Sequence, residues 1–88
     1  MSNRVVWKYE LLPLEITLLP ANAKVVHFGM QQRKFYVWVE VDPSVLQTVP
    51  HDFYVVATGE EIPLHAQYFG TTHEGPFVWH LYEAEIAL

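Results

Sequence analysis

The sequence predicts an all-β fold, a small antiparallel β-sandwich or barrel of six to seven strands. Three observations lead to this prediction. Short segments in which apolar and polar residues alternate recur along the chain, and this period is typical of half-buried strands. Turn signals rich in Gly, Pro, Asn and Asp separate these segments. No segment outside residues 43–50 suggests helix, so we expect one domain over residues 1–88 with no helix longer than about two turns.

The first two strands are predicted over residues 5–11 and 14–19. Residues 5–11 alternate between an apolar face and a face that carries Lys8 and Glu10. Pro13 ends this segment because it cannot donate to a ladder. Residues 20–23 then form a turn.

A β-hairpin is predicted next, from residues 24–30 and 35–42. The second of these segments alternates most strictly, with four apolar residues on one face and Tyr36, Trp38 and two acids on the other. The connecting residues 31–33 lack the Asn-Gly pair that favours a tight turn, so the hairpin prediction depends on the flanking periodicity.

The second half of the chain holds the remaining strands. Residues 43–50 are expected to form either a single helical turn or an irregular loop, closed by Pro50. Residues 53–58 are expected to form a strand that Gly59 ends. Residues 67–72 suggest a short strand, for which we consider a position at an edge of a sheet. A turn over residues 72–76 leads to the last strand, which begins after Gly75-Pro76.

The last strand, residues 77–82, has two unlike faces. Phe77, Trp79 and Leu81 share an apolar face, whereas His80 and Tyr82 lie on a mixed face. The apolar members of the alternating strands are predicted to form the core. They are Trp7, Phe35, Val37, Val39, Phe53, Val55, Phe77, Trp79 and Leu81.

Composition excludes several classes of function. The chain has no cysteine, so neither disulfides nor thiolate metal sites stabilise it. A net charge of −5 makes it a poor general nucleic-acid binder, although Lys24, Arg33 and Lys34 gather in or beside the predicted hairpin. No apolar run approaches the ~20 residues of a membrane-spanning helix. We expect no secretory leader, because Arg4, Lys8, Glu10 and Pro13 interrupt any apolar run that could serve as its hydrophobic segment.

The most specific motifs of the chain are Thr58-Gly59 with Ile62-Pro63 and the run from Gly75 to His80. With them, residues 6–82 resemble a widespread family of small uncharacterised bacteriophage proteins. Other pieces are Trp7-Lys8-Tyr9, Val37 to Asp42 and Tyr68 to Thr71. In the central turn Ala57 replaces a family Gly, and Glu60-Glu61 replace His-Pro. The resemblance implies a phage origin and a compact all-β unit, and it brings no catalytic residues. Action in the host cytoplasm is also expected, and the absence of cysteine is compatible with it.

No constellation in the sequence indicates catalysis or a cofactor. The five histidines lack the close spacings of zinc sites, so we expect no metal. There is no Gly-x-Ser-x-Gly motif and no phosphate-binding loop at Gly59. Asp42, Glu60 and Glu61 are interpreted as solvated loop charges rather than acid–base groups. The protein is therefore not expected to be an enzyme.

One predicted surface combines aromatic rings with imidazoles. Its residues are His27, Tyr36, Trp38, His80 and Tyr82, with the cations Lys24 and Arg33 nearby. If their strands are neighbours, the rings could stack on bases while the imidazoles donate hydrogen bonds to phosphates. The same residues suit a subunit interface, or they belong to the core of a sandwich if a second sheet covers them.

Two functions fit this surface. In the first, the protein is a non-catalytic phage accessory protein that sequesters a small nucleotide-like ligand, such as a host immune signal. In the second, it is a non-catalytic protein that binds a host protein or forms part of a virion.

A homo-oligomer, most simply a dimer, is also expected, because thirteen aromatic residues exceed what a thin core needs. If the dimer buries neutral histidines, acidification below about pH 6.5 should weaken it.

Overall fold

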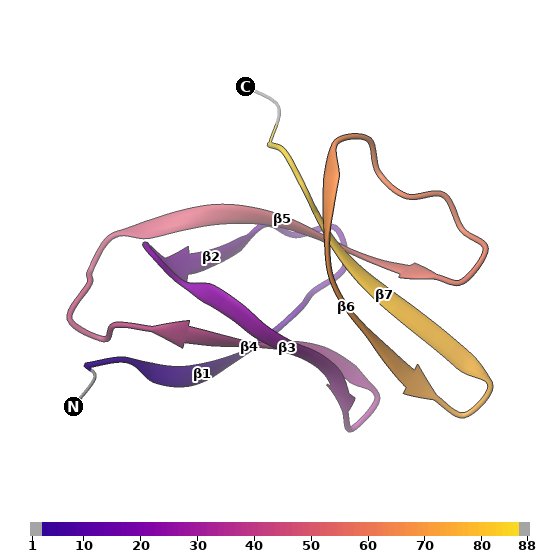
Figure 1. Ribbon diagram of the computed structural model, residues 1–88, viewed down its shortest axis with the longest axis horizontal. Coiled ribbons are helices and arrows are strands. Elements are labelled where there is room, and N and C mark those ends of the chain that lie inside the picture. Colours follow the sequence, from indigo (N-terminus) through magenta and orange to yellow (C-terminus); the bar gives the residue numbers. More distant parts are fainter. Residues whose placement is uncertain (1–2, 87–88) are drawn as a thin grey trace.

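The computed structural model describes residues 3–86 and shows two packed antiparallel sheets (Figure 1). The strands are β1 (Val5–Glu10), β2 (Thr17–Pro20), β3 (Lys24–Gln31), β4 (Lys34–Val41), β5 (Thr48–Ala57), β6 (Ala66–Glu74) and β7 (Phe77–Ala84). One sheet has three strands in the order β1-β4-β3, and the other has four in the order β2-β5-β7-β6. The predicted all-β sandwich is confirmed. The described residues form no helix, and hence none that could cross a membrane.

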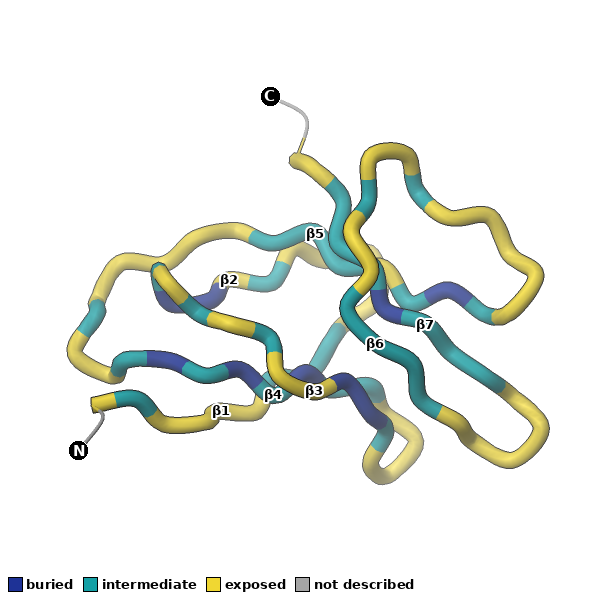
Figure 2. The backbone as a smooth tube through the Cα atoms, in the orientation of Figure 1, coloured by how far each residue is buried: buried dark blue, intermediate teal, exposed yellow. Residues whose placement is uncertain are grey.

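The core lies between the inner faces of the two sheets. Its fully enclosed side chains are Leu19, Phe28, Val37, Val39, Val41 and Leu81. Along one side of the sandwich β3 packs against β6, where Phe28 meets Gly70. A Cβ at Gly70 would lie 3.4 Å from the Cβ of Phe28, so the glycine allows this close approach. Figure 2 shows the buried segments on β2, β3, β4, β5 and β7.

Seven of the nine predicted core residues contribute to the core. Val37, Val39 and Leu81 are fully buried, and Phe35, Phe53, Val55 and Trp79 are partly buried against them. Trp7 and Phe77 were predicted wrongly, since 41% and 55% of their surfaces are exposed. Both point to the inner side, but Trp7 lies on an edge strand and Phe77 begins β7 at the tip of a hairpin. Alternation predicts a side chain's face but not whether the opposite sheet covers it.

Phe28 was missing from the predicted core, and the strand that carries it, β3, is irregular. The register between β3 and β4 shifts between Val25 and His27, as in a β-bulge. Val26 is therefore exposed, although strict alternation places it on the same face as Phe28. The bulge brings Val25 onto the core and leaves His27 on the outer face.

Strand β5 begins earlier than predicted and contains Pro50. Residues 48–51 pair with β2, whereas residues 52–57 pair with β7 on the other edge of β5. At Pro50 the strand thus has one neighbour, and proline is tolerated in such edge positions. The helical turn considered for residues 43–50 does not form; Asp42 instead accepts hydrogen bonds from the Ser44 N–H and hydroxyl, at 3.0 and 2.7 Å. These bonds lower the pKa of the Asp42 carboxyl.

The turn between β3 and β4 yields a first prediction. Gln31 pairs with Lys34, so Gln32 and Arg33 form a two-residue loop, and both have positive φ, 51° and 65°. This is the backbone of a type I′ turn, which favours Asn-Gly. Replacing the pair by Gln32→Asn and Arg33→Gly should raise the free energy of unfolding by about 1 kcal/mol. Urea denaturation tests this, and an unchanged or lower midpoint would contradict the turn type.

Tyr9 yields a pH-dependent prediction. Its side chain packs against the core, and burial raises the pKa of its phenol. The folded pKa of this phenol exceeds the unfolded value of about 10. The stability that comes from keeping the phenol neutral in the folded state is therefore complete below pH 10, and it is lost as the pH rises through the folded pKa. Tyr9→Phe should therefore lose less stability than the parent between about pH 10 and pH 11. Equal losses in urea denaturation at the two pH values would refute it.

Candidate ligand-binding surface

The outer face of the three-stranded sheet carries an uncovered group of aromatic and charged side chains. Since Val37, Val39 and Val41 of β4 are buried, Tyr36, Trp38 and Glu40 lie on the opposite face. Register adds Val6, Lys8 and Glu10 from β1 and Lys24, His27 and Gly29 from β3 to this face. Lys8, Trp38 and His27 lie side by side across the three strands, in that order.

Three rings of this face form a continuous row, which we call the ring row: His27, Trp38 and Tyr36. The ring centroids of His27 and Trp38 lie 5.0 Å apart, and those of Trp38 and Tyr36 lie 6.1 Å apart. The Lys8 ammonium lies 4.7 Å from the centroid of Tyr36, at cation–π distance. It also donates a 2.8 Å hydrogen bond to Gln31 Oε1. The row thus offers flat apolar surface with a cation at one end.

Gly29 makes room for the ring row. It is buried beneath the outer face, directly opposite Tyr36. A Cβ added there would lie 3.0 Å from His27 Nε2 and 3.4 Å from the Trp38 ring. A residue larger than glycine would therefore displace the imidazole, which currently lies against the strand.

Charge is divided unequally between the two sheets. All five basic residues lie on or beside the three-stranded sheet; they are Arg4, Lys8, Lys24, Arg33 and Lys34. That sheet and its end carry three acids, Glu10, Glu40 and Asp42. The seven other acids lie on the four-stranded sheet and its connections, where the chain has no base. The face around the ring row is therefore locally positive although the chain is acidic.

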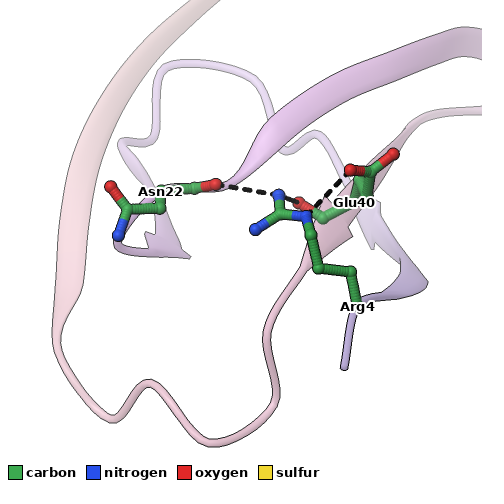
Figure 3. A network of polar contacts seen from close by, with 3 residues as sticks. All are labelled: Arg4, Asn22 and Glu40. Atoms are coloured by element: carbon green, nitrogen blue, oxygen red, sulfur yellow. Dashed lines mark hydrogen bonds and ion pairs between the residues drawn. The ribbon is translucent and has the colours of Figure 1, made fainter. Parts of the chain in front are cut away.

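The two carboxylates on this face are held by cations. Arg4 donates to Glu40 Oε1 at 2.8 Å, to the Glu40 carbonyl at 2.8 Å and to the Asn22 carbonyl at 3.0 Å (Figure 3). Lys34 lies 3.6 Å from Glu10. These contacts neutralise Glu10 and Glu40 in part, so that Lys8, Lys24 and Arg33 dominate the field over the rings.

The structure divides the predicted surface into two. His27, Tyr36 and Trp38 lie together, with Lys24 on the same face and Arg33 at the β3–β4 turn. His80 and Tyr82 instead lie on β7, on the outer face of the other sheet. The five residues therefore do not form one site. The condition that their strands be neighbours holds for β3 and β4 but not for β7, because alternation along single strands does not show which strands share a sheet.

Three tyrosines form a second row, on the outer face of the four-stranded sheet. Tyr54, Tyr82 and Tyr68 are register neighbours across β5, β7 and β6. The rings of Tyr82 and Tyr68 are 5.5 Å apart in an edge-on arrangement. Tyr54 and Tyr68 are 40% and 53% exposed. We call this group the tyrosine row.

His80 is held in a chain of hydrogen bonds beside the tyrosine row. Tyr68 Oη lies 2.5 Å from Thr71 Oγ1, and Thr71 Oγ1 lies 2.9 Å from His80 Nδ1. On the other side of the ring, Nε2 lies 2.8 Å from Thr58 Oγ1. One consistent assignment has Tyr68 donating to Thr71, Thr71 donating to Nδ1 and Nε2–H donating to Thr58. Both ring nitrogens therefore have partners within the chain.

This hydrogen-bond chain unites segments that stand far apart in the sequence. Thr58 belongs to the Thr58-Gly59 turn, in which Gly59 has a φ of 98° and Glu60 Oε1 accepts from the Ala57 N–H at 2.7 Å. Thr71 and Tyr68 belong to the Tyr68–Thr71 motif, and His80 to the last strand. All three motifs contribute to the family resemblance, but alternation along the chain does not place Thr58, Tyr68 or Thr71 in a site. They meet because β7 pairs with β5 on one side and with β6 on the other.

The remaining histidines supply no metal centre. His51 Nδ1 lies 2.6 Å from Glu83 Oε2, and its ring stacks on Phe53. Among residues 3–86 no three His, Cys, Asp or Glu side chains converge as a metal ion requires.

Comparison with known proteins places the chain in a family. A family described as a domain of unknown function (DUF7352) matches residues 2–87. No curated protein and no solved structure matches the chain. Because the match spans nearly every residue, the protein belongs to the DUF7352 family.

Proposed function

We propose that the protein is a non-catalytic phage accessory protein, acting in the host cytoplasm, that sequesters a small nucleotide-like ligand on the ring row. The observation that carries the proposal is the position of the cations. All five surround the sheet whose outer face bears His27, Trp38 and Tyr36. Bases stack on aromatic rings, and phosphates are drawn to clustered cations. The net charge of −5 does not oppose such a site, because the acidic excess lies on the other sheet.

A ligand with two bases and a short phosphate linkage would use both the rings and the cations of this face. The ring row spans β3 and β4, and Lys8 and Lys24 lie on opposite outer strands of the sheet. A cyclic dinucleotide presents flat bases with phosphates between them, and such molecules serve as immune signals in bacteria. Binding without chemistry is sufficient to remove the signal.

Thermal denaturation with a ligand panel tests this proposal. The panel contains cyclic di-AMP, cyclic di-GMP and cyclic GMP-AMP, with the corresponding free nucleosides as controls that lack phosphate. A ligand present at 100 times its Kd stabilises the folded state by about 2.7 kcal/mol and should raise the Tm by about 10 °C or more in a domain of this size. The nucleosides should raise it less. If no cyclic dinucleotide raises the Tm at millimolar concentration and low salt, the proposal fails.

The tyrosine row supports a second candidate function, the binding of a host or virion protein. Tyr is enriched at protein interfaces, and the exposed Tyr54 and Tyr68 flank the half-buried Tyr82 in acidic surroundings. A comparison of the proteins that co-purify with the parent, with Tyr82→Ala and with Trp38→Ala tests it. A partner lost only with Tyr82→Ala would favour this function, and identical sets of proteins would count against it.

A further inference from the structure

We propose that β1 is the interface of a two-fold homodimer, in which the β1 strands of two copies pair antiparallel and join two three-stranded sheets into one of six strands. The inference does not depend on the proposed function, because β1 borders the ring row without contributing a ring to it. It is drawn from the unequal protection of the four sheet edges.

Three of the four edge strands carry a feature that blocks pairing with another chain. Strand β3 has a bulge at Val26 and packs against β6. Strand β6 has a register shift between Tyr68 and Gly70. Strand β2 has four residues and ends at Pro20. Bulges, short strands, proline and coverage are the means by which sheet edges avoid association.

Strand β1 has none of these features. It pairs over six residues with β4 in a regular register and has no described strand on its other side. Its charged residues are Lys8 and Glu10. The Lys8 ammonium is drawn back over Tyr36 to Gln31, away from the edge, and Glu10 at the end of the strand lies 3.6 Å from Lys34 of β4. Val5, Val6 and Trp7 are 42%, 55% and 41% exposed, and most of β1 is coloured as exposed in Figure 2. Register puts Val6 on the outer face and Val5 and Trp7 on the inner face, so apolar surface is uncovered on both faces of the strand. A neighbouring strand would cover both faces at once.

The open backbone groups of β1 can be assigned. Leu11 N–H donates to the Phe35 carbonyl at 2.9 Å, and hydrogen-bonded pairs alternate along an antiparallel ladder. The odd residues of β1 are therefore bonded to β4. Val6, Lys8 and Glu10 direct their N–H and C=O groups toward the free edge. If the partner is a second copy of β1, its even-numbered residues must therefore pair with these three.

Charge complementarity selects a second copy as the partner and sets the register. If two β1 strands overlapped completely, the two-fold axis would pass between Trp7 and Lys8, and even-numbered residues would face odd-numbered ones. The alternation of hydrogen-bonded pairs therefore moves the axis onto either Trp7 or Lys8. A centre on Lys8 would place two ammonium groups opposite each other. A centre on Trp7 places Trp7 against its symmetry mate, Val5 against Tyr9, and Arg4 against Glu10 at both ends. A base just before the strand, Arg4, and an acid at its end, Glu10, are what antiparallel self-pairing requires, and each would add this contact to the one it makes with Glu40 or Lys34 of its own copy.

Single cysteines provide a direct test, because the chain has none of its own. In the proposed register two residues at position 7 face each other with Cα atoms about 4.5 Å apart, within disulfide range. Trp7→Cys should form a covalent dimer under mild oxidation. Lys8→Cys is the matched control, since its two copies would lie beyond the ~7 Å limit. Faster cross-linking of Lys8→Cys would overturn the register.

The mass of the parent protein in solution tests the interface itself. Light scattering should give a dimer at high micromolar concentration, and Val6→Pro should reduce it to a monomer because Val6 loses its edge-facing N–H. Val6→Ser keeps that N–H and should remain largely dimeric. No histidine lies on β1, so the dimer mass should persist near pH 5, whereas an interface built on buried histidines would dissociate. A monomeric parent, or a Val6→Pro variant that stays dimeric, would overturn the proposal.

Discussion

Phe28→Ala is expected to lower the free energy of unfolding by about 3–5 kcal/mol, the largest loss we expect from any single change in this chain. Only 2% of the Phe28 surface is exposed, and its ring stacks on that of Phe35 with the centroids 5.7 Å apart. The side chain fills the corner where β3 meets Gly70 of β6. Removing its ring leaves a cavity at the contact between the two sheets. The free energy of unfolding of a small domain is about 5–15 kcal/mol in total, so the variant would be close to unfolding at room temperature.

Phe77→Ala is the matched control for Phe28→Ala. It removes the same ring from the same apolar pattern, but Phe77 is 55% exposed and its main contact is a stack on Trp79 at 5.9 Å. Phe77→Ala should therefore lower the free energy of unfolding by less than about 1.5 kcal/mol. Urea denaturation of both, with Phe28→Leu as a milder change that keeps the fold, would measure the difference. If the two alanine variants were equally stable, the assignment of the core would be incorrect.

Trp38→Ala should reduce the affinity for a cyclic dinucleotide by about 5- to 150-fold, because stacking of one base on an aromatic ring contributes about 1–3 kcal/mol. Trp38 is the central ring of the row and contacts both His27 and Tyr36. Trp38→Phe keeps a flat ring and should retain most of the affinity. Tyr82→Ala removes a ring from the other sheet and should leave binding unchanged.

Two further variants separate shape from charge at the same surface. Gly29→Ala keeps every ring but places a Cβ 3.0 Å from His27 Nε2, so it should weaken binding by displacing the imidazole. Lys24→Gln should weaken binding and make it less sensitive to salt, since one cation fewer faces the phosphates. Isothermal calorimetry at two salt concentrations measures both effects. Affinity that survives Trp38→Ala, Gly29→Ala and Lys24→Gln together would place the ligand elsewhere.

The sequence predicted the strands well because the signal for each is local. Residues 35–42 alternate strictly, and β4 lies over nearly the same residues with the predicted faces. The errors occur where the outcome depends on a partner strand. The bulge at Val26 shifts the face of Val25, and the pairing of β5 with β2 allows Pro50 to lie in a strand. Neither feature follows from the period of a single segment.

The candidate surface was predicted in part for the same reason. His27, Tyr36 and Trp38 come from one hairpin, whose two strands must be neighbours, and the structure brings them together. His80 and Tyr82 were grouped with them only because they also occupy the mixed face of a strand. Arg33 was correctly placed beside the hairpin, and its φ of 65° shows a backbone that Gly would suit better. The segregation of charge between the sheets required the sheet order, which alternation does not give.

The most direct test of the ring row as a ligand site is the response of the three indole N–H resonances in a ¹⁵N-labelled sample titrated with a cyclic dinucleotide. Trp38 lies in the ring row, Trp7 lies on β1 and Trp79 packs against the core. We predict that the Trp38 resonance, assigned with Trp38→Phe, shifts and saturates while that of Trp79 stays in place. Resonances that all remain unchanged, or a shift confined to Trp7 or Trp79, would contradict a ligand site on the outer face of the three-stranded sheet.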